Sequence, residues 1–196
     1  YVTQAPIVLL KDMHSGAILF SRGADKRFAP ASMAKVMTAY VVLDLIKKGE
    51  LSREKLFTVS EATWKKWNGS TGGSTMFLRS GEKVSVDDLL KGLITVSGND
   101  AAVALAEAVG GTLEQFVAMM NRQAAAWGLA NTQFKNVAGL TEAGHYSSAR
   151  DLALIAMHVL EDFPEYYASY YSLKQYTYNN IRQDNRNLLL GRDPTV

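Results

Sequence analysis

Residues 32–48 are the segment that most constrains how this chain can fold. Apolar side chains recur along it at helical spacing and cover so much of the circumference that the predicted helix is buried nearly all round. These side chains are Met33, Val36, Met37, Tyr40, Val41, Leu43 and Leu45. Gly49 supplies the expected end of the helix. A helix of this kind needs other elements packed against it on both sides.

The remaining patterns predict an α+β fold with one hairpin of sheet and about five helices. Residues 7–10 and 17–20 are apolar runs on either side of a polar turn, so they predict a hairpin whose strands are largely buried. Further helices are expected at residues 89–95, 100–109, 113–127 and 149–160. Short strands are expected near residues 55–59, 75–78 and 174–178. No linker or internal repeat divides the sequence, which favours one folding unit.

Composition excludes several classes of function. The net charge is only +2 and the basic residues are scattered, so no nucleic-acid partner is expected. The absence of cysteine excludes a disulfide framework and thiolate metal sites. His14, His145 and His158 lack ligand-like spacing, so neither a metal nor another cofactor is predicted. No apolar stretch reaches the roughly 20 residues of a membrane span, so any membrane anchor would lie outside this chain.

The start of the apolar helix carries a pair of residues suited to nucleophilic catalysis. Ser32 and Lys35 are three residues apart, which places their side chains on one helical face. A serine hydroxyl needs a base, and lysine can serve if burial lowers the pKa of its amine. The apolar neighbours of Lys35 favour that. The alternative is an ordinary helix cap at Ser32, with Lys35 extending from the core to solvent.

Two other places in the chain have the same Ser-x-x-Lys spacing. They begin at Ser52 and Ser80, and both lie in polar, turn-like surroundings. Only the pair formed by Ser32 and Lys35 begins a buried helix. The spacing alone is therefore a weak signal, and the apolar context distinguishes the three matches.

Ser97-Gly98-Asn99 is the only Ser-x-Asn in the chain, and it separates two predicted helices. A turn at this place can aim a hydroxyl and a carboxamide into a cleft. The alternative is that Asn99 caps the helix that follows, while Gly98 supplies an unusual backbone angle.

The two motifs together resemble those of the penicillin-binding proteins and serine β-lactamases. Longer blocks, in the same order, resemble the low-molecular-weight D-alanyl-D-alanine carboxypeptidases, and the resemblance runs from Ala5 to the last residue. The blocks are residues 30–40, 73–78, 97–101, 147–151 and 185–189. The resemblance implies the penicillin-binding transpeptidase fold, with a helical subdomain at roughly residues 50–165 and an antiparallel sheet.

The resemblance also implies roles for individual residues. Ser32 would be the nucleophile that forms an acyl-enzyme, Lys35 its general base and Ser97 a proton relay. Asn99 would hold the substrate. Arg186 would lie near the terminal carboxylate of the substrate, or else in an ion pair with another part of the chain.

One motif of the family is missing. A Lys-Thr-Gly sequence normally follows the block at residues 185–189, on a sheet strand that binds the substrate carboxylate, and this chain does not contain it. We therefore expect residues 1–196 to be a single catalytic domain that is incomplete at its C-terminal end. Strands beyond Val196 would complete the sheet, either in the same polypeptide or in a second chain produced by cleavage. Alone, this segment would be inactive.

The implied function is a serine D,D-carboxypeptidase that removes the terminal D-alanine of peptidoglycan stem peptides and is acylated by β-lactams. It would act in the periplasm or on the outside of the cell envelope, after removal of a signal peptide. A serine β-lactamase is one alternative, and a non-catalytic cell-wall-binding module is another.

Two sets of aromatic residues each allow two interpretations. Trp64 and Trp67, with the glycines at 69, 72 and 73, are expected to form a flexible loop that lies near the active site or merely connects two elements. The tyrosines between residues 166 and 178 favour amphipathic packing over a carbohydrate-binding platform.

Overall fold

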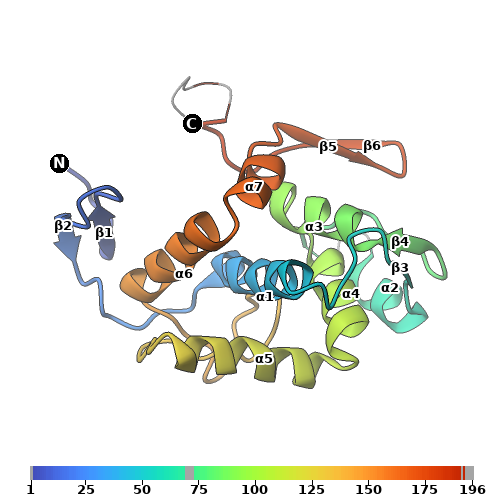
Figure 1. Cartoon of the computed structure of the whole chain (residues 1–196), viewed down its shortest axis with the longest axis horizontal. Helices are drawn as coiled ribbons and strands as arrows, with labels where there is room; N and C mark the ends of the chain where they lie inside the picture. The colour runs from blue at the N-terminus through green and yellow to red at the C-terminus, as the bar shows by residue number, and fades with distance from the viewer. Residues whose placement is uncertain (1, 69–72, 191, 193–196) are drawn as a thin grey trace.

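The computed structural model describes residues 2–68, 73–190 and 192, and its described part is a helical body with three separate two-stranded sheets (Figure 1). The helices are α1 (Lys35–Lys47), α2 (Glu61–Trp67), α3 (Val86–Thr95), α4 (Asn99–Gly110), α5 (Leu113–Ala126), α6 (Ala149–Asp162) and α7 (Pro164–Tyr166). The strands pair antiparallel as β1 (Val8–Lys11) with β2 (Ile18–Arg22), β3 (Leu56–Thr58) with β4 (Lys83–Ser85), and β5 (Gln175–Tyr178) with β6 (Ile181–Asp184). The α+β prediction is confirmed.

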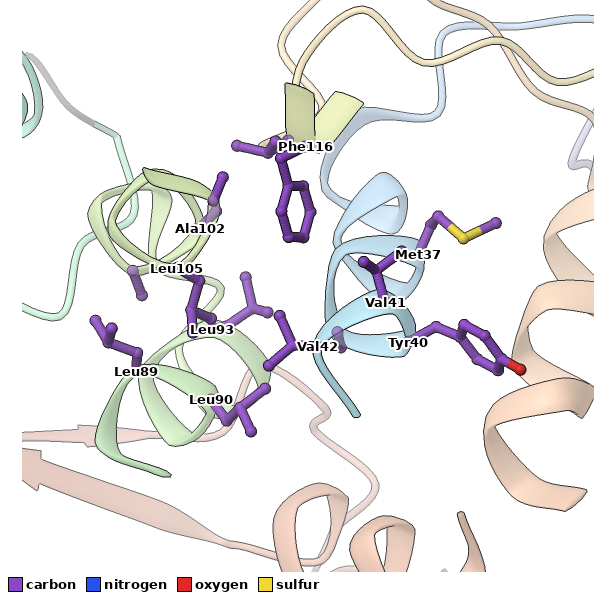
Figure 2. Close-up of a cluster of buried hydrophobic side chains, with 14 of the residues drawn as sticks. Met37, Tyr40, Val41, Val42, Leu89, Leu90, Leu93, Ala102, Leu105 and Phe116 are labelled. Atoms are coloured by element: carbon purple, nitrogen blue, oxygen red, sulfur yellow. The ribbon is translucent and has the colours of Figure 1, made fainter. Parts of the chain in front are cut away.

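Helix α1 lies at the centre of the fold, in contact with α3, α4, α5 and α6 (Figure 1). Every residue from 37 to 43 is at most 6% exposed, as the all-round apolar pattern predicts. Val42 points toward α3, and Phe116 of α5 fills the space between α1 and α4 (Figure 2). On the opposite side the Tyr40 hydroxyl donates to Asp162 of α6 at 2.8 Å. The core therefore fixes α1 from several directions.

The beginning of α1 differs from the prediction by one turn. Residues Ala31–Ala34 form a tight 3-10 turn, in which the Met33 N–H donates to the Pro30 carbonyl, and α-helical geometry starts at Lys35. Ala31 has a left-handed backbone (φ +49°), so the chain enters the turn from a conformation that cannot continue a helix. Gly49, at φ +74°, ends the helical segment as predicted.

The N-terminal hairpin forms where it was predicted, but the expectation that its strands are largely buried is wrong within the described residues. Leu10, Ile18 and Leu19 are 40%, 49% and 63% exposed. The hairpin packs against α6, where the Lys11 amine lies 3.5 Å from the Met157 sulfur. Contact with one helix leaves much of the apolar surface of the hairpin open.

Two predictions for the segment between α1 and α3 are wrong. Residues 75–78 do not pair as a strand, because the Met76 and Leu78 N–H groups donate to the Asp100 carboxylate and Phe77 has a left-handed backbone. Trp64 and Trp67 belong to helix α2 and not to a loop. The Ser60 hydroxyl caps α2, and Trp67 is buried in the core. Gly69 and Gly72 lie outside the described residues.

The tyrosines near the C-terminal end pack on α3, which agrees with the packing interpretation. Tyr170 donates to Asp87 at 2.6 Å and Tyr176 donates to Asp88 at 2.9 Å. These contacts place the π-helical turn Tyr167–Tyr171 and the hairpin of β5 and β6 against the first turn of α3.

Among the described residues, no single helix has both the length and the hydropathy of a membrane span. Helices α4 and α5 reach these thresholds only when taken together, across a bend of 88°.

We expect Leu43→Ala to lower the free energy of unfolding by about 2–5 kcal/mol, because Leu43 is fully buried in the central helix and its loss leaves a cavity. Leu56→Ala is the control, since Leu56 is 58% exposed and its truncation should cost less than about 0.5 kcal/mol. Urea unfolding of the whole protein measures both. Equal effects would contradict the central placement of α1.

Candidate functional site

Ser32 and Lys35 are brought together by the 3-10 turn that precedes α1. The Lys35 amine lies 3.2 Å from the Ser32 hydroxyl oxygen, which is hydrogen-bond distance. Ser32 is exposed, whereas Lys35 is 5% exposed. An accessible hydroxyl thus has a buried amine as its neighbour.

Burial changes the acid–base chemistry of Lys35. Removal from water lowers the pKa of its amine from 10.5 to about 8, since the charged form loses hydration. The amine also donates to the Ala138 carbonyl at 2.7 Å, which fixes its position. At pH 7 about one tenth of such amines are neutral, far more than at the pKa of a free lysine. Lys35 can therefore accept a proton near neutral pH.

Ser97 lines a small pocket together with Ser32 and Lys35. It has a left-handed backbone (φ +60°) between α3 and α4, and its neighbour Gly98 donates to the Gly92 carbonyl at 3.1 Å. Left-handed backbone at a residue other than glycine is costly and is common at functional sites. The pocket has a volume of about 100 Å³ and is lined by Ser32, Lys35, Val36, Leu93, Ile94, Ser97 and Tyr171. Tyr171 was not singled out in the sequence analysis.

Asn99 is placed beside this pocket and not among its lining residues. It is the first residue of α4 and is 7% exposed. Its N–H donates to the Ser74 carbonyl at 2.7 Å, and its amide nitrogen lies close to Gly73, where a Cβ atom would be 3.1 Å away. Asn99 thus joins the start of α4 to the segment that begins at residue 73.

Asp100 holds that segment in place. Its carboxylate is 3% exposed and accepts hydrogen bonds from the Thr75 hydroxyl and from the N–H groups of Met76, Leu78 and Ala101, at 2.5–3.1 Å. A buried carboxylate requires such partners. Asp100 therefore ties residues 75–78 to the turn that carries Ser97.

Arg186 and Ser32 both line a second, larger pocket. Both residues line a cavity of about 640 Å³, together with apolar side chains of α1 and α3. Its guanidinium donates to the Val96 carbonyl at 3.3 Å, next to Ser97. Within residues 2–68, 73–190 and 192, no carboxylate lies within 4 Å of this guanidinium, which disfavours the ion-pair alternative. Arg186 is available to an anionic group in the cavity.

The other two Ser-x-x-Lys matches are exposed at both positions. Ser52 donates to Glu54 at 2.6 Å. The lysines of these two matches, Lys55 and Lys83, are not buried as Lys35 is. The described part of the chain also contains no group of three or more histidine, aspartate or glutamate side chains placed to hold a metal ion.

Sequence reasoning missed the contribution of residues 136–140. This turn supplies the carbonyl that holds Lys35, and its Gly139 lies directly against the peptide bond before Ser32. The spacing Asn-x-x-Gly is a turn signal that was available in the sequence, although nothing in it indicates a contact with Ser32.

Solved structures share this architecture. The chain superposes on penicillin binding protein 5 from Haemophilus influenzae with a TM-score of 0.88 and 44% identity, covering 97% of this chain and 56% of that one. It superposes on penicillin-binding protein D2 from Listeria monocytogenes in its cefotaxime-bound form with a TM-score of 0.81 and 26% identity, covering 97% and 76%. The fold is that of the penicillin-binding proteins.

Sequence comparison specifies the family. Residues 2–196 match the S11 peptidase family, described as D-alanyl-D-alanine carboxypeptidase, and the chain belongs to this family. It is 45% identical over 192 residues to the D-alanyl-D-alanine carboxypeptidase DacA of Haemophilus influenzae, covering 98% of this chain and 48% of that protein. The chain therefore spans about half the length of the curated relatives it matches.

We expect Asp100→Asn to lower the free energy of unfolding by about 2–4 kcal/mol, because the amide nitrogen would face N–H donors that now bond a carboxylate. Asp25→Asn is the matched control. Asp25 pairs with Arg150 on the surface and is 59% exposed, so its loss should have a far smaller effect on the free energy of unfolding. Urea unfolding compares the two, and similar values would contradict the anchoring role of Asp100.

Proposed function

We propose that this chain supplies the nucleophile and the general base of a serine D,D-carboxypeptidase. The observation that carries the proposal is the 3.2 Å contact between the exposed Ser32 hydroxyl and the buried Lys35 amine, whose pKa is lowered to about 8. The names of the family and of the relatives support this substrate class. The substrate is the D-alanyl-D-alanine end of a peptidoglycan stem peptide.

The proposed reaction has two stages. The neutral Lys35 amine accepts the Ser32 proton while the serine oxygen attacks the carbonyl carbon of the terminal peptide bond. The tetrahedral intermediate collapses, the C–N bond breaks, and Lys35 returns its proton through Ser97 to the amine of the leaving D-alanine. Water then attacks the resulting ester while the neutral Lys35 accepts a proton from it. The bond between the acyl carbon and the Ser32 oxygen breaks, the shortened peptide leaves, and Lys35 gives the proton back to Ser32.

Two further residues bind the substrate in this proposal. Arg186 faces the cavity that it shares with Ser32 and attracts the terminal carboxylate of the substrate. Asn99 bonds the substrate backbone from the start of α4. Its amide nitrogen lies close to Gly73 in this structure.

The proposed domain extends beyond this chain. Two strands with exposed apolar side chains are marginally stable, so further strands should cover the hairpin of β1 and β2. The match to about half of each relative supports the same proposal. A strand with a Lys-Thr-Gly motif would complete the site, in the same polypeptide or in a second chain produced by cleavage, beside a helical subdomain at roughly residues 50–165.

The proposed location is the periplasm or the outer side of the cell envelope, where peptidoglycan is found. β-Lactams are proposed as covalent inhibitors, because the cefotaxime-bound relative shares the fold.

The two alternatives make different predictions about a penicillin adduct. A serine β-lactamase would form the adduct and release it quickly, whereas a cell-wall-binding module would form none. The carboxypeptidase forms a long-lived adduct. The names of the relatives support the carboxypeptidase over both alternatives.

We expect a fluorescent penicillin to label the full-length protein at Ser32, because Ser32 alone among the three matches has a buried lysine beside it. Peptide mapping by mass spectrometry locates the adduct. The serines at 52 and 80 serve as internal controls within the same molecule. An adduct at either of them, or at Ser97, would contradict the proposed nucleophile.

Lys35→Arg should slow acylation by roughly 10²–10⁴-fold, since arginine keeps the charge but cannot act as a base. The control is Lys83→Arg, which changes an exposed lysine at the same spacing from Ser80 and should leave the rate within a few-fold.

In the unmodified protein the acylation rate should rise with pH and level off above about 8, because lower pH protonates Lys35. A rate independent of pH between 6 and 9 would exclude Lys35 as the base.

Residues 1–196 expressed alone should aggregate or form a molten state that does not bind penicillin, because the apolar hairpin would remain uncovered. Analytical ultracentrifugation, near-UV circular dichroism and penicillin labelling test this. A monomeric, cooperatively folding and penicillin-reactive segment would contradict the proposal that further strands are required.

A further inference from the structure

The turn at residues 136–140 bonds the first turn of α1 through two consecutive carbonyl groups. The Val137 carbonyl accepts from the Thr38 hydroxyl at 2.8 Å, and the Ala138 carbonyl accepts from the Lys35 amine at 2.7 Å. Val137, Ala138 and Thr38 are each at most 3% exposed. The backbone of this turn therefore covers the amine and fixes its position.

The same turn also touches the backbone that carries Ser32. Gly139 has φ +85°, and a Cβ atom built on it would lie 1.8 Å from the Ala31 carbonyl oxygen and 3.0 Å from the Ser32 nitrogen. No side chain can occupy that space without moving one of the two backbones. Contact between Gly139 and Ala31 thus sets how closely the turn approaches the serine.

A single side chain shapes the turn. The Asn136 amide oxygen accepts from the N–H groups of Gly139 and Leu140 at 2.8 and 3.0 Å. Its amide nitrogen donates to the Leu140 carbonyl at 2.9 Å and to Glu142 at 3.2 Å. Three hydrogen bonds from Asn136 thus hold the five-residue turn in its present form, and the fourth ties it to Glu142.

We propose that Asn136 and Gly139 are positioning residues, which hold the Lys35 amine buried and the Ser32 backbone in place through the turn that they shape. The inference rests on the proposed function for its effect on acylation. Its effect on Lys35 itself does not depend on that function.

The charge state of Lys35 is governed here by burial. Tyr171 is the titratable side chain that shares its pocket. Several titratable groups on the elements packed around α1 have hydrogen-bond partners of their own, among them Asp87 and Asp88 of α3, Asp100 of α4 and Asp162 of α6. In the loop that contains the turn, the Nδ1 atom of His145 accepts from the Lys135 N–H, and its buried Nε2 atom has no hydrogen-bond partner among the described residues. Displacing the turn would admit water as a new acceptor for the amine, so the pKa of Lys35 should rise toward that of a free lysine.

Asn136→Ala in the full-length protein tests the proposal, with Asn121→Ala as the matched control. Asn121 also makes two hydrogen bonds to this loop, but to the backbone of Phe134, away from Lys35. The pKa of Lys35 is followed by NMR of ¹³C-labelled lysine, and the acylation rate by fluorescent penicillin. We expect Asn136→Ala to raise the pKa of Lys35 by at least one unit, to shift the pH profile equally, and to slow acylation at pH 7 by about tenfold per unit. Asn121→Ala should change neither.

A second pair of variants keeps the test decisive if Asn136→Ala fails to fold. Gly139→Ala and Gly128→Ala both place alanine at positive φ, +85° and +66°, but nothing lies within 4 Å of a Cβ atom at Gly128. Gly139→Ala should slow acylation by about 100-fold, since an ångström of displacement has effects of this size. Gly128→Ala should stay within a few-fold.

The outcomes separate the inference from the proposed function. An unmodified protein that penicillin does not acylate would refute the proposed function, while the NMR comparison would still decide the inference. An unchanged pKa of Lys35 in Asn136→Ala, or equal acylation rates in Gly139→Ala and Gly128→Ala, would overturn the inference that Asn136 and Gly139 are positioning residues.

Discussion

The arrangement of the site depends on a single buried amine. Lys35 remains close to neutral because water is kept away from it, and it remains aimed at Ser32 because the Ala138 carbonyl holds it. Both conditions require α1 to be enclosed on several sides, which the apolar pattern of residues 36–45 ensures. The burial of α1 that the core requires is thus also the condition for a neutral Lys35 in the site. A looser core would give a lysine that is charged and a serine without a base.

Local features of the site could be predicted from the sequence because they depend on neighbours a few residues away. The spacing of Ser32 and Lys35 and the break at Ser97 are of this kind. The context argument also separated the pair with a buried lysine from the exposed pairs that begin at Ser52 and Ser80. What the sequence did not indicate was the 3-10 geometry at Ser32, which follows from the left-handed backbone of Ala31.

The features that escaped prediction depend on contacts between distant parts of the chain. Asp100 accepts hydrogen bonds from a segment more than twenty residues earlier. The conformation of residues 75–78 is therefore set by a carboxylate and not by pairing with another strand. The Ala138 carbonyl meets Lys35 across 103 positions. No periodicity marks either contact. Propensity and spacing describe elements, whereas these contacts are set by how the elements assemble.

The position of the N-terminal hairpin has a consequence for the order of folding. The hairpin lies far from α6 in the sequence, yet it packs on that helix, and the contact between Lys11 and Met157 spans 146 positions. Closing so long a loop carries an entropic cost that contacts between adjacent helices do not carry. Helices α3, α4 and α5 follow one another closely in the sequence and can pack together before the hairpin contacts α6. The hairpin of β1 and β2 is therefore expected to dock after these helices have packed together.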